Sequence, residues 1–184
     1  RFSDPVRQQR LKMAVDAGVR FVMLRDHEAS PEAFGQAGEA LIPWLLERDV
    51  QVVVNTRVGL AEQWGTGAHV GTRGPAVDTV RSRLGEDVLI GYSMHRGEAV
   101  PEKVDYVTFS PVFPTSSKHG HPGEGLQALR DVCRQSAVPV YALGGVTPAR
   151  LEACREAGAA GVAVLSAIME AEEPASVVRQ FLRV

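Results

Sequence analysis

The sequence predicts an α/β protein with the TIM (β/α)8 barrel architecture, formed by a single domain over residues 1–184. Short apolar runs of β-forming residues alternate with helical patterns along the chain, and no linker or low-complexity tract interrupts them. Residues 139–145 and 161–166 are two such runs, separated by one helical segment. A strand, a helix and a strand in this order form a βαβ unit, whose strands should be parallel.

The first half of the chain provides four of the predicted strands. A helix is expected over residues 5–17, followed by a strand at residues 20–25. Ser30 and Pro31 begin the next helix, because serine caps helices well and proline fits the first helical position. Phe34, Ala37, Leu41, Trp44 and Leu45 then recur at the helical period. The remaining elements here are strands at residues 51–55, 68–71 and 88–93, and helices at residues 58–64 and 75–84.

The second half continues the alternation. A short helix is expected near Glu98, a strand at residues 105–109 and a helix at residues 126–135. Strands at residues 138–143 and 161–165 flank the helix of the βαβ unit. Thr147 is its expected N-cap, Pro148 its first residue and Gly158 its left-handed C-cap. Residues 175–182 form the closing helix.

The predicted elements leave the barrel one strand short. The helix at residues 5–17 has no strand before it, whereas a closed barrel of this type needs eight strands. The chain, at 184 residues, is also shorter than usual barrels, which begin at about 200 residues. We therefore expect the first strand to precede Arg1.

Composition describes an ordinary globular protein, with 45% hydrophobic and 23% charged residues. A net charge of −2 disfavours nucleic acid and anionic membranes as partners, and no apolar run is long enough to span a membrane. The two cysteines, Cys133 and Cys154, fall in predicted helices and are interpreted as small buried residues of a reducing compartment. The expected location is cytoplasmic.

In such a barrel, functional residues follow the carboxyl ends of the strands. The residues at these positions are polar, with several hydrogen-bond donors and few acids. They are Arg25, Asp26, His27, Asn55, Thr56, residues 71–74, Ser93, His95, residues 110–121, Gly144, Gly145 and Ser166.

Gly144, Gly145 and Ser166 end the last two predicted strands, where phosphate groups commonly bind in these barrels. Glycines let a ligand approach backbone N–H groups, and helix N-termini favour an anion. The alternative is a pair of turns built from small residues.

Residues 110–125 form the longest irregular segment, and a loop of this length is usually functional or disordered. Thr115, Ser117 and Lys118 can contact phosphate oxygens there, the lysine acting as a point charge. The alternative is a mobile surface loop with ordinary polar residues.

Six short motifs occur in order along nearly the whole chain. They are LRD at residues 24–26, VNTRV at 54–58, AHVG at 68–71, GYSMH at 91–95, SPVFPT at 110–115 followed by Lys118, and ALGG at 142–145 followed by AVLS at 163–166. Together they resemble the thiamine phosphate synthase/TenI family. The resemblance implies a TIM barrel that handles a thiazole phosphate and, in the synthase, a pyrimidine diphosphate with Mg²⁺.

The resemblance also implies residue roles. Gly145 and Ser166 match the thiazole-phosphate pocket, and Thr115, Ser117 and Lys118 match the loop that grips pyrophosphate. The pyrimidine and diphosphate side is matched by Arg25, Asn55 and Ser93. The partner expected from this match is a small phosphorylated ligand of the thiazole type, and the oligomeric state is left open, a homo-oligomer included.

The chain departs from the synthase pattern around the diphosphate. Thr56 and Gly74 stand where the synthase pattern has metal-binding carboxylates, and Met23 and His27 stand where it has Gln and Lys. Magnesium in proteins usually takes one or two carboxylates. We therefore expect no metal ligand and no cofactor, with Arg73 beside the lost acid as a partial replacement for the charge.

Loss of these carboxylates is similar to the TenI branch, which isomerises a thiazole tautomer phosphate by proton transfer. The acid/base histidine of that branch matches Pro111 here, so His95 or the loop residues His119, His121 and Lys118 would have to replace it. Each histidine also has a structural or solvent-exposed interpretation.

The resulting hypothesis is a thiazole phosphate tautomerase of the TenI type. The alternatives are a thiamine phosphate synthase and a non-catalytic binder of a thiazole or thiamine phosphate. An unrelated phosphosugar-binding barrel would use the same phosphate site but would not explain the loop at residues 110–115.

Overall fold

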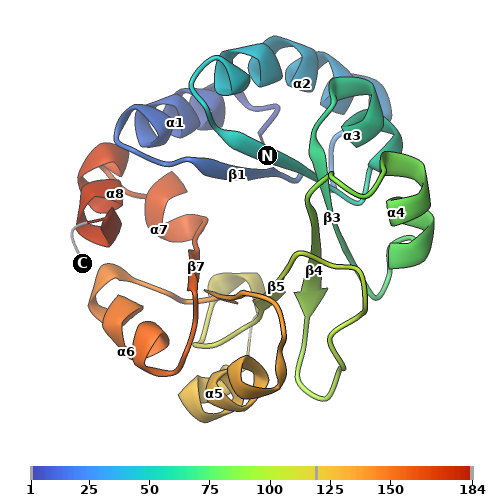
Figure 1. Ribbon diagram of the computed structural model, residues 1–184. Helices are drawn as coiled ribbons and strands as arrows, with labels where there is room; N and C mark the ends of the chain where they lie inside the picture. The colour runs from blue at the N-terminus through green and yellow to red at the C-terminus, as the bar shows by residue number, and fades with distance from the viewer. Residues whose placement is uncertain (1, 119, 183–184) are drawn as a thin grey trace.

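A parallel sheet of seven strands forms the centre of the molecule, and its strands follow chain order from β1 to β7. The computed structural model describes residues 2–118 and 120–182. The helices form a ring outside the strands (Figure 1). The strands are β1 (Phe21–Leu24), β2 (Gln51–Asn55), β3 (Gly67–Gly71), β4 (Ile90–Met94), β5 (Tyr106–Phe109), β6 (Val140–Leu143) and β7 (Gly161–Ala163).

The helices alternate with the strands as expected, except between β4 and β5. They are α1 (Pro5–Asp16), α2 (Pro31–Leu46), α3 (Val58–Trp64), α4 (Val77–Leu84), α5 (Gly125–Gln135), α6 (Leu151–Glu156), α7 (Ser166–Met169) and α8 (Pro174–Leu182). Two 3₁₀ turns, η1 (Ser116–Lys118) and η2 (Pro148–Arg150), lie in the loops after β5 and β6.

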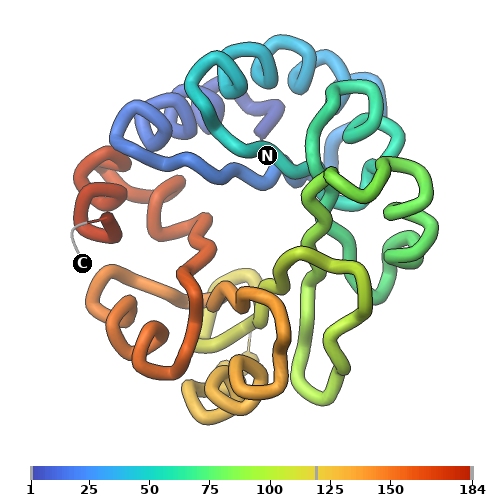
Figure 2. The backbone as a smooth tube through the Cα atoms, viewed as in Figure 1, coloured from blue at the N-terminus to red at the C-terminus, as the bar shows by residue number. Residues whose placement is uncertain are grey.

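The sheet is curled but its two ends do not pair. Among the described residues, β1 and β7 are the edge strands of the sheet. Helices α1, α7 and α8 pack against one another on this side, so that the backbone trace forms a ring (Figure 2). The prediction of a parallel α/β barrel is thus confirmed for seven strands, and the eight-stranded closure remains a prediction.

A local sequence signal explains where α2 begins. The Ser30 hydroxyl accepts a hydrogen bond from the Ala33 N–H at 3.2 Å and caps α2. Phe34, Leu41 and Leu45 on this helix are fully buried, as their spacing predicts.

Three local features differ from what the sequence predicts. The chain makes a turn near Glu98 and no helix, because the Glu98 carboxylate accepts the His95 N–H and closes the turn. Thr147 is the N-cap and Pro148 the first residue, as predicted, but the Thr147 side chain makes no capping hydrogen bond and the first turn is the 3₁₀ turn η2. The short helix α7 was not predicted, since four residues are too few to show a period.

Aromatic side chains fill the interior of the ring at the amino ends of the strands. Tyr106 makes edge contacts with Phe21 and Tyr141, at centroid distances of 5.3 and 5.7 Å. Gly91 makes room for them, because a Cβ there would lie 2.1 Å from the Tyr106 ring. These rings close the interior at the amino ends of the strands.

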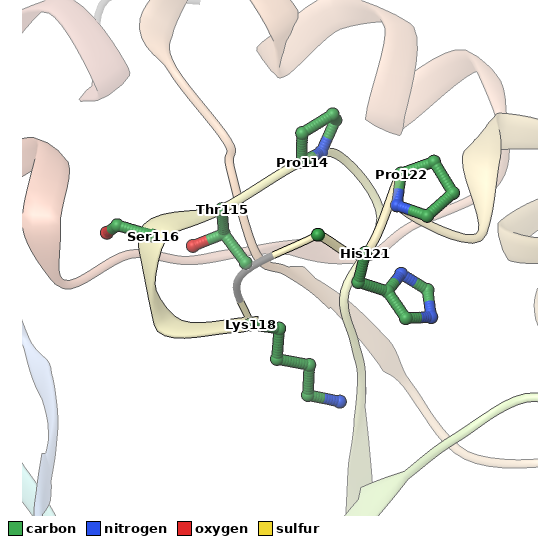
Figure 3. A pocket seen from close by; sticks show the side chains of 7 residues that line it. Pro114, Thr115, Ser116, Lys118, His121 and Pro122 are labelled. Atoms are coloured by element: carbon green, nitrogen blue, oxygen red, sulfur yellow. The ribbon is translucent and has the colours of Figure 1, made fainter.

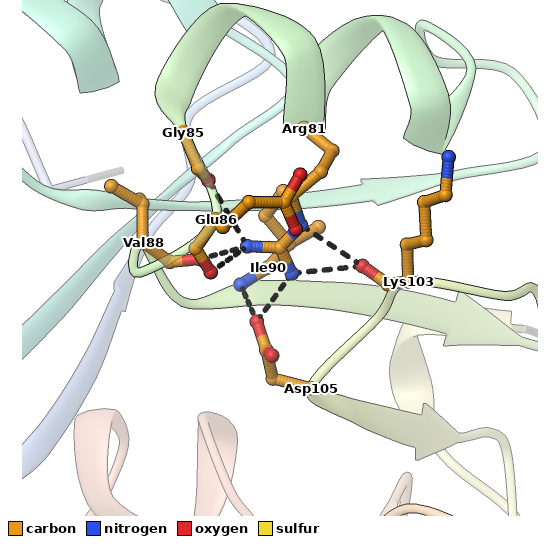
Figure 4. A network of polar contacts seen from close by, with 7 residues as sticks. All are labelled: Arg81, Gly85, Glu86, Val88, Ile90, Lys103 and Asp105. Atoms are coloured by element: carbon orange, nitrogen blue, oxygen red, sulfur yellow. Dashed lines mark hydrogen bonds and ion pairs between the residues drawn. The ribbon is translucent and has the colours of Figure 1, made fainter.

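A buried arginine organises the loops at the amino ends of β4 and β5 (Figure 4). The Arg81 guanidinium, from α4, donates to the backbone carbonyls of Gly85, Glu86, Val88 and Lys103 and to the Asp105 carboxylate. The same carboxylate accepts the N–H of Ile90 at 2.6 Å. We call these residues the Arg81 network.

No helix in the described part of the chain is both long and apolar enough to cross a membrane.

Candidate active site

The strand ends bring three predicted ligand residues to one edge of the sheet. Arg25 follows β1, Asn55 ends β2, and Ser93 lies one residue before the end of β4. Because neighbouring strands are parallel, these positions share the carboxyl end of the sheet. Asn55 is held by a hydrogen bond from its Nδ2 to the His69 carbonyl at 3.2 Å, whereas Arg25 is exposed.

A buried histidine connects the site to the interior. His69 is fully buried on β3, and its two ring nitrogens lie 2.8 Å from the hydroxyls of Ser93 and Tyr106. Burial, followed by the charge of Arg25, lowers the pKa of His69 from 6.5 to about 4. A neutral imidazole therefore fixes the Ser93 hydroxyl at neutral pH.

The contact between His69 and Ser93 was not predicted from the sequence. The signal that would have found it is strand register. His69, Ser93 and Tyr106 face the same side of three neighbouring strands, so their side chains must meet inside the ring.

The base of the long loop after β5 is fixed to the end of β6. The N–H groups of Val112 and Phe113 donate to the carbonyls of Leu143 and Gly144, at 2.9 and 3.0 Å. The Arg150 guanidinium lies 4.6 Å from the centre of the Phe113 ring and donates to the Gly145 carbonyl at 2.6 Å. The loop thus has an ordered base rather than two free ends.

An open cavity of about 390 Å³ lies within this loop (Figure 3). Lys118 and His121 extend to the same side of the loop in this view, which places a cation beside the cavity. Ser117 is exposed and does not line the cavity, and His119 lies outside the described residues. The lining residues are Pro114, Thr115, Ser116, Lys118, Gly120, His121 and Pro122.

The two glycines after β6 have a packing role. Gly144 and Gly145 have positive φ angles, 94° and 64°. A Cβ at Gly144 would lie 2.7 Å from Pro111 Cα, and one at Gly145 would lie 2.3 Å from the Pro114 carbonyl oxygen. Glycine is therefore required to bring the loop against β6, whether or not a ligand approaches. Ser166 begins α7, after the neighbouring strand β7.

The remaining candidate histidines have partners of their own. His121 accepts the Gly123 N–H through Nδ1 at 3.0 Å, and its Nε2 lies 3.3 Å from the Glu124 carboxylate. His95 Nδ1 lies 3.7 Å from the Glu98 carboxylate, and its side chain is 45% exposed. Of the two, His95 is the more available for proton transfer.

The acidic side chains near the strand ends also have hydrogen-bond or ion-pair partners within the protein. Asp26 is buried and accepts the Ser3 hydroxyl at 2.8 Å and the N–H groups of Glu28 and Ala29. Its role is to close the turn between β1 and α2. Glu28 has a partner as well.

The other two acids are similarly occupied. Glu98 accepts the Thr72 hydroxyl and the His95 N–H, both at 2.9 Å, and Glu124 lies near Arg96 and His121. Within residues 2–118 and 120–182, no three His, Cys, Asp or Glu side chains gather as a metal site.

The fold and the site define a parallel α/β barrel protein whose polar residues gather at the carboxyl ends of the strands. Within that class, the chain belongs to the thiamine monophosphate synthase family, whose model matches residues 5–168. The family resemblance inferred from the motifs is thereby confirmed.

Named relatives agree with this assignment. The chain is 36% identical over 179 residues to the thiamine-phosphate synthase of Synechococcus sp. (strain WH7803), and the match covers 95% of this chain and 51% of the relative. It is 39% identical over 173 residues to the thiamine-phosphate synthase of Laribacter hongkongensis, covering 91% and 81% respectively. The chain therefore spans about half of the first relative and most of the second.

A solved structure confirms the fold. The thiamine phosphate pyrophosphorylase of Pyrococcus furiosus matches with a TM-score of 0.85 and 24% identity, over 98% of this chain and 88% of that chain.

Proposed function

We propose that this chain is a thiamine phosphate synthase, which couples a pyrimidine diphosphate to a thiazole phosphate and releases the diphosphate. One observation carries the proposal: the motifs shared with the family all end at the carboxyl face of a single parallel sheet. The names of the relatives support synthase chemistry over the tautomerase expected from the sequence.

The proposed roles divide the site residues into three groups. Ser166 and the backbone at Gly144 and Gly145 would hold the thiazole phosphate, beside the ordered base of the long loop. Lys118 and Thr115 line the cavity that would hold the diphosphate, with Ser117 nearby in η1.

The third group of residues would receive the pyrimidine. Asn55 offers an amide donor and acceptor, Ser93 offers a hydroxyl fixed by His69, and the exposed Arg25 would face the diphosphate.

The test is direct turnover. Purified protein is mixed with the pyrimidine diphosphate and the thiazole phosphate, and thiamine phosphate is measured by chromatography. Product formation that disappears without either substrate supports the proposal. Absence of product, with both substrates shown to bind, would contradict it.

A tautomerase, or a binder without turnover, is the second candidate, and the occupied acids at the strand ends favour it. Pro111 has no proton to transfer, so His95 would be the acid/base. The test measures the rate at which the protein converts the tautomer carboxylate phosphate. A rate that falls about 10²- to 10⁴-fold in His95→Asn, while phosphate binding is retained, would support this candidate over the synthase. The same result for a His119→Asn variant would place the group in the loop instead.

A further inference from the structure

Apart from residues 101–105, which lead into β5 at the opposite end of the sheet, the segments that follow the strands carry more cations than acids among the described residues. The acids are Asp26, Glu28, Glu98 and Glu124, and each has a partner. The cations are Arg25, Arg57, Arg73, Arg96, Lys118 and Arg150. The face is therefore suited to an anion with several negative charges.

Half of these cations are already engaged. Arg57 stacks on the Phe34 ring at 4.5 Å and donates to the Ala29 carbonyl. Arg96 faces Glu124, and Arg150 is held at Gly145.

The other three cations are available. The side chains of Arg25, Arg73 and Lys118 make no hydrogen bond or ion pair with the described part of the chain. They follow β1, β3 and β5 of the parallel sheet, so all three lie at the carboxyl ends of its strands. Burial, and then the charges of Arg25 and Arg57, lower the pKa of the nearby His27.

We infer that this site binds a diphosphate without a divalent cation, and that the Arg73 guanidinium supplies the charge in place of the metal. A guanidinium is always charged and can donate two parallel hydrogen bonds to phosphate oxygens. Arg73 lies between the ends of β2 and β4, beside the strand that carries Ser93. The inference rests on the proposed function for the ligand class alone.

The residue after β2 shows what a metal-binding version would need. Thr56 has a φ of 64°, a left-handed conformation that is costly for a β-branched residue and easier for Asp or Asn. A Cβ at Gly74 would make a tight contact with the Gly71 carbonyl oxygen, at 3.2 Å, so a side chain there requires the Gly71 backbone to shift by a few tenths of an ångström. Thr56→Asp and Gly74→Asp would thus place two carboxylates at neighbouring strand ends.

The experiment is calorimetric titration with inorganic pyrophosphate, in EDTA and in Mg²⁺ at equal free pyrophosphate. Wild type should bind in EDTA and gain nothing from Mg²⁺. Arg73→Gln should weaken binding about tenfold, the value of one charge-assisted hydrogen bond. Arg155→Gln, an exposed arginine on the last turn of α6, is the matched control and should bind as wild type does.

Three results would overturn the inference: no pyrophosphate binding in either buffer, tenfold tighter wild-type binding with Mg²⁺, or unchanged binding in Arg73→Gln. The double variant Thr56→Asp/Gly74→Asp should gain a dependence on Mg²⁺. If that variant does not fold, Arg73→Gln still decides. Pyrophosphate binding is measured without turnover, so this experiment tests the inference even if the synthase assay gives no product.

Discussion

His69 shows how one buried residue can make stability depend on pH. The unfolded chain takes up the proton near pH 6.5, whereas the folded chain resists it down to about pH 4. The contribution of His69 to the free energy of unfolding should therefore be fully present above pH 6.5. It should fall as the pH drops towards 4, because the unfolded state then binds more protons than the folded state. The change should approach about 3 kcal/mol.

Urea unfolding between pH 4 and 7 measures this slope. His69→Gln keeps hydrogen-bonding capacity near Ser93 without a titrating ring, so its slope over this range should be smaller. An equal slope in the variant would assign the pH dependence to other groups.

For single residues, the sequence predicted positions at the strand ends but not the residues that they contact. Arg25, Asn55 and Ser93 were placed at strand ends by local pattern alone. The role of Gly145 depends on Pro114, 31 residues away in the sequence, and no local pattern carries such a contact. The roles of these residues toward a ligand remain proposals.

Two glycines of α2 make a matched pair at the scale of one element. A Cβ at Gly35 would meet nothing within 4 Å, whereas one at Gly38 would lie 2.1 Å from the Trp64 ring of α3. Gly35→Ala should stabilise the protein by about 0.5–1 kcal/mol, because alanine loses less backbone entropy in a helix. Gly38→Ala should destabilise it by about 1–3 kcal/mol through overpacking.

Chemical denaturation of both variants gives the comparison, and each serves as the control for the other. Equal effects in the two variants would mean that α2 and α3 do not pack as closely as the structure has them.

Helices and strands could be predicted where the sequence pattern was local and spanned enough residues. The apolar run of β2 and the helix of α3 were predicted with the bounds that the structure has. The turn at Glu98 was not, because a carboxylate that caps a turn and one that begins a helix look alike in sequence. Helix α7 was missed because its four residues lie just after an apolar strand.

At the scale of the whole molecule, the Arg81 network joins the loops at the amino ends of β4 and β5. Arg81 is 4% exposed and satisfies four carbonyls besides Asp105, so its removal leaves several buried acceptors unpaired. Arg81→Met should cost about 3 kcal/mol or more of unfolding free energy. In sequence this arginine resembles any exposed helical arginine, so the network was not predicted.

The control for this variant is Arg83→Met on the same helix. Arg83 pairs with Glu62, and both side chains are about half exposed, so its loss should cost less than about 1 kcal/mol. Thermal unfolding of the two variants separates the effects. A similar melting temperature in both would show that the Arg81 contacts contribute little.

The position of the Arg81 network also predicts how often each end of the barrel opens locally. Its bonds close the end of the barrel opposite to the candidate site, and they include the N–H of Ile90. That amide should be among the last to exchange its hydrogen for deuterium, while amides of the loop after β5 exchange early. The amino end of the barrel would then remain structured while the loop at the carboxyl end opens often. A ligand would gain repeated access to the candidate site without unfolding of the sheet.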